Sequence, residues 1–187
     1  MIDFINIIFQ NKLQFLVIGP QTAIGYLDIF PHIMNNEMWM GYHYHLSGFR
    51  KSDGTLIPKN DNLPRSCCWF TNLDVSYRHD KLILTENYNP ALYPKYYNYD
   101  AIDVKKTMSI PCDYNGLMGV PLTFLQKYNP DQFEIVGLSG QVANKMPRSL
   151  PKHLKGGPAF YLQNNDGSFK RLFGKMVIRN KQVIKNE

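Results

Sequence analysis

One serine of the sequence lies in a context that resembles that of a catalytic nucleophile. Ser139 is part of Gly137-Leu-Ser-Gly140, at the end of an apolar run. A nucleophile elbow requires Gly-x-Ser-x-Gly with a helix after the serine, and here the second glycine comes one residue early. We therefore expect Ser139 and Gly140 to let the chain leave a strand, and a small hydrolase that uses Ser139 is a remote alternative.

Two other groups of side chains could support metal binding or acid–base chemistry. His43-Tyr-His45 places two imidazoles on the same side of an extended segment, which would suit a metal ion if further ligands converged. Surface or hydrogen-bonded histidines are the more common arrangement. Asp100 and Asp103 would need a pocket to act as acid or base, and we expect them to be solvated. Neither Gly-x-Gly-x-x-Gly nor a phosphate-binding P-loop occurs in the sequence.

Tyrosines and lysines alternate in one segment, and a second segment is basic and interrupted by prolines. In a surface that meets nucleic acid, cations bind phosphates while rings stack or wedge. A tyrosine-rich loop packed on the domain fits the first segment equally well. The second segment could follow a phosphate backbone or be a solvated linker. The candidate DNA-binding residues are Lys95, Tyr96, Tyr97, Lys105, Lys106, Arg148, Lys152 and Lys155. We assign no residue to catalysis, cofactor binding or metal binding.

The net charge of +6 is unevenly distributed along the 187 residues. Residues 141–187 hold ten Lys or Arg against Asp166 and Glu187, so this stretch carries +8 and the remainder −2. Such an asymmetry favours a polyanionic partner, although solvated surface lysine is a commoner cause. Three cysteines form neither a disulfide framework nor a zinc motif, which predicts a cytoplasmic protein. The apolar amino terminus is broken by polar residues, so we expect neither export nor a membrane span.

Helices and buried strands alternate at the start of the chain, which is typical of the α/β class. Residues 2–13 have helical apolar spacing, and Gln14–Ile18 reads as a strand buried in a parallel sheet. Tyr26–Met34 predicts a helix that Pro31 should kink or shorten, and Met38–Tyr42 predicts a strand.

The remainder of the chain is richer in loops and short strands. Between residues 43 and 111 the expected strands are Cys67–Thr71 and Lys81–Thr85, and Phe133–Leu138 is a further strand. Asn165-Asp166-Gly167 is a turn signal that predicts a hairpin between Ala159–Leu162 and Leu172–Arg179.

Several long motifs occur in a recognisable order. They are Cys68-Trp-Phe-Thr-Asn-Leu73, Tyr99-Asp-Ala-Ile102, the run from Ile110 to Phe124, and the run from Lys127 to Gly137. In these motifs the chain resembles the EcoRI-type adenine-specific DNA methyltransferases. The resemblance extends back through Phe15–Gly19 to Trp39–Tyr42 and weakly forward to Phe173–Asn180.

The resemblance implies transfer of a methyl group from S-adenosylmethionine to the exocyclic amine of a flipped adenine in double-stranded DNA. The family's Asn-Pro-Pro-Phe-like motif and cofactor loop do not occur here. In the family that motif precedes a helix and strand like Ile2–Gln10 and Gln14–Ile18. We therefore expect a carboxyl-terminal portion that is inactive and binds no cofactor alone, since nothing would position the methyl group. A separate amino-terminal half is a possible partner.

The expected fold is α/β: a partial Rossmann-like class I methyltransferase sheet with an irregular loop-rich insertion and a C-terminal hairpin. Residues 1–42 would belong to the catalytic domain, 43–111 to a target-recognition insertion, and 112–187 to the return to the core and the basic hairpin. The alternative function is a non-catalytic nucleic-acid-binding module derived from such an enzyme, which predicts salt-sensitive DNA binding.

Overall fold

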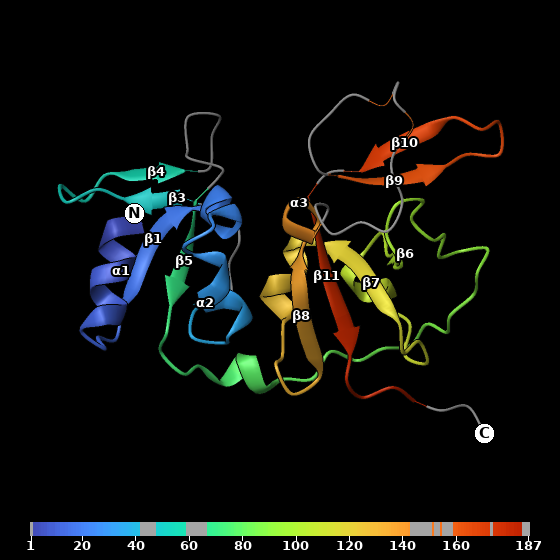
Figure 1. Ribbon diagram of the computed structural model, residues 1–187. Coiled ribbons are helices and arrows are strands. Elements are labelled where there is room, and N and C mark those ends of the chain that lie inside the picture. Colours follow the sequence, from blue (N-terminus) through green and yellow to red (C-terminus); the bar gives the residue numbers. More distant parts are fainter. Residues whose placement is uncertain are drawn as a thin grey trace. The chain divides into compact units, whose positions relative to one another are not determined.

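The computed structural model describes residues 2–41, 48–58, 67–142, 151, 154, 159–172 and 174–184. It is a mixed α/β structure with several small sheets, which confirms the expected class (Figure 1). The chain divides into two compact units, Met1–Tyr77 and Arg78–Glu187.

The first unit contains a three-stranded antiparallel sheet with strand order β1-β5-β2. Pro31 lies in the first turn of α2, where its missing N–H removes no helical hydrogen bond, and the helix is shorter than the predicted Tyr26–Met34. A two-stranded hairpin, β3–β4, completes the unit. The elements are α1 (Ile2–Gln10), β1 (Leu16–Pro20), η1 (Gln21–Gly25), α2 (Phe30–Met34), β2 (Trp39–Met40), β3 (Gly48–Arg50), β4 (Leu56–Pro58) and β5 (Cys67–Thr71).

The prediction for Gln14–Ile18 was wrong in two respects. The strand β1 pairs antiparallel with β5, and its outward residues Leu16 and Ile18 are 56% and 54% exposed. The adjacent Phe15 points to the opposite face of the strand, where its ring contacts Phe9 of α1 at 5.8 Å. A continuous apolar run therefore did not mean burial on both faces.

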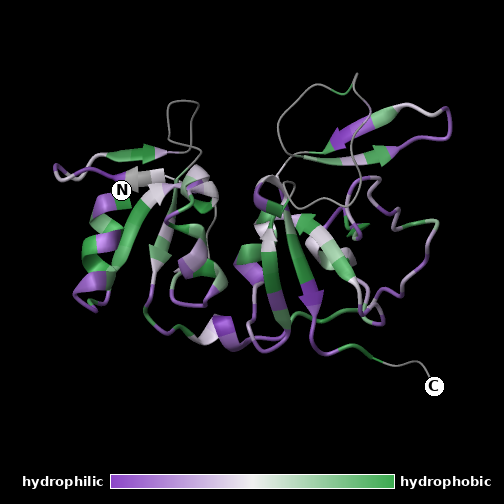
Figure 2. Ribbon diagram, in the orientation of Figure 1, coloured by the Kyte–Doolittle hydropathy of each residue, from purple (hydrophilic) through white to green (hydrophobic). Residues whose placement is uncertain are grey.

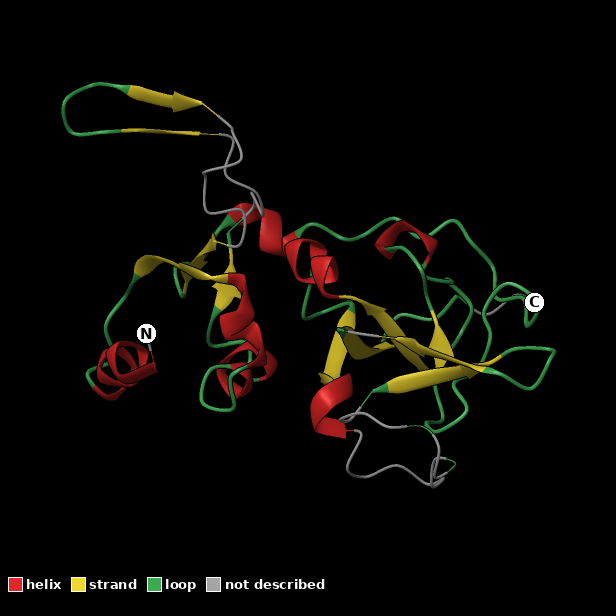
Figure 3. Ribbon diagram, turned by 90° about the horizontal axis from the view of Figure 1, so that it is seen from above, coloured by secondary structure: helices red, strands yellow, loops and turns green. Residues whose placement is uncertain are grey.

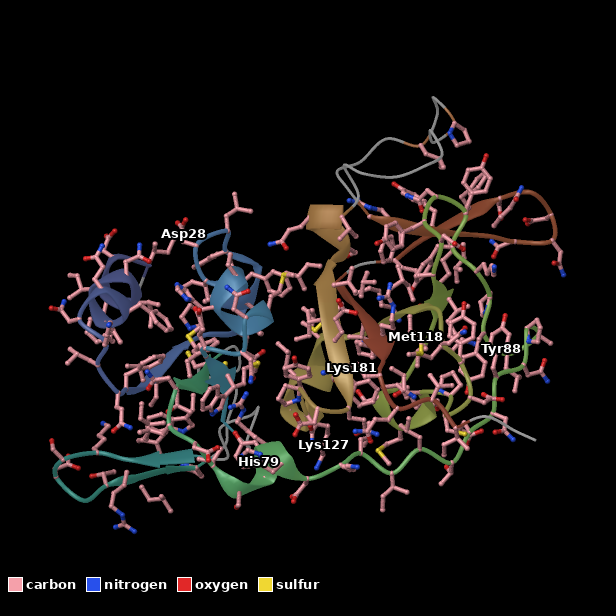
Figure 4. All side chains as sticks on the ribbon, turned by 60° about the horizontal axis from the view of Figure 1, so that its bottom comes forward. Asp28, His79, Tyr88, Met118, Lys127 and Lys181 are labelled. Atoms are coloured by element: carbon pink, nitrogen blue, oxygen red, sulfur yellow. The ribbon has the colours of Figure 1, made fainter. Side chains whose placement is uncertain are left out.

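The second unit is built on a four-stranded mixed sheet with strand order β6-β7-β11-β8. β6 runs parallel to β7, and the other pairs are antiparallel. Met118, labelled in Figure 4, is fully buried, as are Val177 and Ile178. The elements are η2 (Ser76–His79, at the boundary), β6 (Ile102–Asp103), η3 (Thr107–Ser109), β7 (Leu117–Pro121), η4 (Leu122–Lys127), β8 (Phe133–Leu138), α3 (Ser139–Val142), β9 (Phe160–Gln163), β10 (Phe169–Leu172) and β11 (Lys175–Asn180).

The predicted C-terminal hairpin is present, but one of its strands was misplaced. β9 pairs with β10 across a turn in which Gly167 has φ +81°, a conformation that favours glycine. The predicted partner Leu172–Arg179 is instead mostly β11, a central strand between β7 and β8. Its continuous run of buried residues suits a strand with neighbours on both sides.

The predicted strand Lys81–Thr85 is not a strand in the structure. The backbone of Leu82 is satisfied by a side chain: its N–H donates to Gln132 Oε1, and Gln132 Nε2 donates to its carbonyl, both at 2.8 Å. An amide side chain thus replaces the neighbouring strand that the sequence pattern suggested.

Candidate nucleic-acid interface

An open hollow of about 460 Å³ lies on the second unit, at the amino-terminal ends of β6 and β7. Lys95 reaches it through an isolated bridge to Ile102, the first residue of β6. Arg179 reaches it because it lies opposite Leu117 in the β7–β11 register. The hollow is lined by Lys95, Tyr99, Asp100, Tyr114, Asn115, Gly116, Leu117 and Arg179.

Aromatic contacts fix the two tyrosines of the hollow. The ring of Tyr99 stacks on Phe160 at 5.0 Å, and that of Tyr114 lies 4.5 Å from Tyr88, which Figure 4 labels. Burial raises the pKa of both Tyr99 and Tyr114, so both phenols stay neutral at pH 7 and can donate a hydrogen bond. A Cβ at position 116 would lie 2.6 Å from Tyr114 Oη. Any residue other than glycine would therefore require the Tyr114 ring to shift.

Both cations of the hollow have carboxylate partners that water reaches. Lys95 Nζ lies 3.7 Å from Asp100 Oδ1, and these side chains are 64% and 89% exposed. Arg179 Nη1 donates to Glu134 Oε2 at 3.1 Å, and both side chains are about half exposed. Exposed pairs of this kind are weak, so a phosphate can replace the carboxylate. The arrangement suits an anionic ligand flanked by rings.

Lys105 and Lys106, two of the predicted DNA-binding residues, are exposed on the turn between β6 and η3. The N–H of Val104 donates to the carbonyl of Gly119 and that of Ser109 to the carbonyl of Lys106, both at 3.0 Å. These bonds hold the turn at the carboxyl-terminal end of β6, so the hollow and the two lysines lie at opposite ends of this strand. Arg148, Lys152 and Lys155 lie outside the described residues.

Tyr96 and Tyr97 were both expected to contact DNA, but the structure buries Tyr96 and leaves only part of Tyr97 accessible. Tyr96 is 5% exposed and stacks on Phe160 at 4.4 Å, so its ring belongs to the core and is not available to a base. Tyr97 is half-buried, and its ring meets Phe169 of β10 edge-on at 4.8 Å. The interpretation as a packed loop therefore holds for Tyr96.

Asp100 and Asp103 have different environments, although both were expected to be solvated. Asp100 is exposed, whereas the side chain of Asp103 is 4% exposed and lies 2.7 Å from Lys175 Nζ. The hydroxyl of Tyr96 also donates to Asp103 Oδ1 at 2.8 Å. The expectation was wrong for Asp103 because a cation from β11, 72 positions further along the chain, neutralises it.

Ser139 has a structural role. It is 5% exposed, and its Oγ accepts a hydrogen bond from the backbone N–H of Lys175 at 3.3 Å. As expected, the chain leaves the strand at Ser139, since β8 ends at Leu138 and the short helix α3 follows it directly (Figure 3).

The structure gives no support for a metal site or a membrane span in the part of the chain it describes. His43 and His45 lie outside the described residues. Among the residues that are described, no three His, Cys, Asp or Glu side chains gather where they could hold a metal ion. Over the same residues, no helix has the length and apolar character needed to cross a membrane.

Sequence reasoning missed Tyr114, Asn115, Gly116 and Arg179. The dipeptide Asn115-Gly116 is a turn signal, and it could have placed these residues just before β7. Arg179 gives no such local signal, since only the pairing of β11 with β7 brings it to the hollow.

Comparison with known proteins gives a consistent result along the chain. A family model described as the adenine-specific methyltransferase EcoRI matches residues 1–181. The type II methyltransferase M.EcoRI of Escherichia coli is 44% identical over 148 residues, which are 72% of this chain and 45% of that protein. M.MgeORF184P of Mycoplasma genitalium is 42% identical over 149 residues, or 72% and 47% of the two chains.

A third relative matches over a longer alignment. M.MpnI of Mycoplasma pneumoniae is 33% identical over 206 aligned positions, which cover 97% of this chain and 61% of that protein. The chain thus spans about half the length of the first two relatives and 61% of the third. No solved structure matches.

Proposed function

Because this chain belongs to the EcoRI family of adenine-specific methyltransferases, we propose that it is the DNA-holding portion of an enzyme that methylates the exocyclic amine of adenine in double-stranded DNA. The observation that carries the proposal is the family match over residues 1–181. The hollow of the second unit supports it, because two cations and two rings meet there. DNA backbones are bound by such cations, and bases stack on such rings.

In this proposal the hollow, Tyr97 and the exposed Lys105 and Lys106 contact DNA, and residues 43–111 contribute to target recognition. Lys105 and Lys106 add positive charge at the other end of β6. Phosphate contacts would set the position of the duplex, and contacts to base edges would set the target sequence. Arg148, Lys152 and Lys155 are also proposed to bind DNA, and their positive charge is the only support for this.

S-adenosylmethionine would supply the methyl group in the complete enzyme. The hollow shows no preference for its sulfonium cation, because Lys95 and Arg179 line it together with the single carboxylate of Asp100. The sequence also lacks the glycine-rich loop that often binds such a nucleoside cofactor. We therefore assign DNA binding to this chain and derive no step of methyl transfer from its residues.

The first unit would form part of the catalytic domain. β1 and β2 both run antiparallel to β5, so they run parallel to each other, and α2 lies between them in the chain. A strand, a helix and a parallel strand make up the unit from which Rossmann-like sheets are built. This arrangement supports a partial Rossmann-like sheet that other strands of a methyltransferase complete.

Two measurements test the proposal. Fluorescence anisotropy with duplex DNA should show binding that weakens by about 100-fold between about 50 mM and 200 mM salt, as expected for about four phosphate contacts. The chain should transfer no methyl group alone, but should methylate adenine when mixed with the unmatched portion of M.EcoRI and S-adenosylmethionine.

The outcomes separate the enzyme from a non-catalytic binding module. Absence of DNA binding at both salt concentrations would contradict both functions. Salt-sensitive binding with no methylation by the mixture, despite a stable complex of the two polypeptides, favours the non-catalytic module.

A further inference from the structure

The pair Asn115-Gly116, which lines the hollow of the second unit, is the only Asn-Gly in the sequence. An asparagine followed by glycine can react within its own chain, because the backbone nitrogen of the glycine can attack Cγ of the asparagine side chain. The two groups are held next to each other, which favours reaction over one between separate molecules. Glycine also allows the attack most easily, since it carries no side chain and has permissive backbone dihedrals. Asparagine accordingly counts among the thermolabile residues of proteins.

The local structure leaves Asn115 able to react. Its side chain is exposed, and neither Asn115 nor Gly116 belongs to a helix or strand. Among the described residues, no hydrogen bond holds the Asn115 side chain or the Gly116 N–H. Asn98 is the opposite case, because it is fully buried, its Nδ2 donates to the carbonyl of Ala159, and its Oδ1 accepts from the N–H of Tyr161. We therefore expect Asn115 to react and Asn98 to stay intact.

Packing fixes the glycine of the pair. A Cβ at position 116 would lie 2.6 Å from Tyr114 Oη, and the ring of Tyr114 lies 4.5 Å from that of Tyr88. The ring that lines the hollow thus requires the residue that makes the asparagine labile. Figure 2 shows that β11 becomes hydrophilic at its carboxyl-terminal end, which contributes Arg179 to the hollow. Water, the second reactant, therefore has access to this polar surface and to the exposed Asn115.

We propose that Asn115 is a site of spontaneous deamidation that weakens the binding of DNA in the hollow, an effect that rests on the proposed function. The Gly116 nitrogen forms a bond to Asn115 Cγ as it gives up its proton. The bond between Cγ and Nδ2 breaks, and ammonia leaves with that proton. Water then opens the resulting succinimide ring at either of its carbonyls. The product is an aspartate, or an isoaspartate in which the main chain runs through Cγ.

Either product adds one negative charge to the hollow. The lining holds two cations, Lys95 and Arg179, and one carboxylate, Asp100, so its net charge falls from +1 to 0. A new carboxylate beside these cations competes with phosphate for them. Loss of one phosphate contact corresponds to about eightfold weaker binding at about 0.1 M salt and to a salt slope reduced by about 0.9. The isoaspartate also lengthens the main chain before Leu117, whose register with Arg179 shapes the hollow.

The test follows the full chain during incubation at mildly alkaline pH, which favours loss of the backbone proton. Peptide mass spectrometry should show aspartate and isoaspartate accumulating at Asn115 while Asn98 stays intact. Anisotropy titrations with duplex DNA should show the eightfold loss in the aged protein. Asn115→Asp should show the loss without incubation. Aged and fresh Asn115→Gln should bind equally, because glutamine would have to close a larger ring.

The modification and its effect on DNA fail through different results. An Asn115 that stays intact in the folded chain overturns the modification site, and its conversion in the urea-unfolded chain would then show that the fold protects it. Equal affinities of fresh and fully converted protein, or an equal loss in aged Asn115→Gln, overturn the effect on the hollow. Failure of the fresh protein to bind DNA would contradict the proposed function, and the mass spectra would still decide whether Asn115 is modified.

Discussion

Lys175 Nζ lies 2.7 Å from Asp103 Oδ1, and the two side chains are only 11% and 4% exposed. The same ammonium donates to the carbonyl of Val104 at 2.9 Å, and Tyr96 Oη donates to Asp103 Oδ1. β6 and β11 are not neighbours, since β7 lies between them. The network crosses β7 at Gly119, where a side chain would overlap the Tyr96 hydroxyl. It therefore ties together three strands and the tyrosine-rich loop.

Loss of the Lys175 charge should destabilise the second unit strongly. In Lys175→Met, Asp103 is left as a buried carboxylate without its cation, a change that costs about 3–5 kcal/mol. Arg179→Met is the matched control, because it removes an exposed ion pair from the same strand and should cost less than about 1 kcal/mol. Urea unfolding measures both free energies, and similar values for the two variants would show that the buried pair is unimportant.

Tyr96 should make the protein less stable at alkaline pH. Burial, followed by the charge of Asp103, raises the pKa of Tyr96 well above its ordinary value of 10.0. The unfolded chain loses this proton near pH 10 while the folded chain keeps it, so this stabilisation is complete below pH 10 and declines above it. One such group contributes a slope of up to about 1.4 kcal/mol per pH unit. Tyr96→Phe should reduce the slope in urea unfolding between pH 9 and 11, and a slope equal to that of the unmodified protein would contradict this role of Tyr96.

Elements set by local sequence were predicted more accurately than those set by distant pairing. Cys67–Thr71 and Phe133–Leu138 are strands with the predicted bounds, because each is a short apolar run between turn signals. β11 was assigned to the hairpin because nothing nearby in the sequence reveals its pairing with β7 and β8. The antiparallel neighbour of β1 is likewise about 50 residues away.

The same distinction applies to the candidate site. Composition identified Lys95, Lys105 and Lys106, which the structure shows to be exposed. It could not separate Tyr96 from its neighbours, because the burial of that ring depends on Phe160, which follows 64 positions later. Arg179 was missed for the same reason, since β-sheet register brings it to Leu117.

Lys105 and Lys106 should contribute to DNA affinity without reading the sequence. Lys105→Ala and Lys106→Ala should each weaken binding to duplexes of different sequence by a similar factor. If each lysine contacts one phosphate, the slope of log K against log salt should fall by about 0.9 per substitution. Lys127→Ala is the control, because Lys127 is exposed in the second unit outside the proposed interface. Anisotropy titrations at several salt concentrations measure the slope, and an unchanged slope in both variants would exclude these contacts.

Substitutions of Arg179 and of Glu134 are expected to change the affinity for DNA in opposite directions. Arg179→Gln removes a cation from the hollow and should weaken DNA binding several-fold, with a salt slope reduced by about 0.9. Glu134→Gln removes the carboxylate that competes with phosphate for Arg179, so it should strengthen binding. Both variants break the same exposed ion pair, whose contribution to folding is at most about 1 kcal/mol. If the pair acted only through stability, both substitutions would shift the anisotropy titration in the same direction, which would remove Arg179 from the interface.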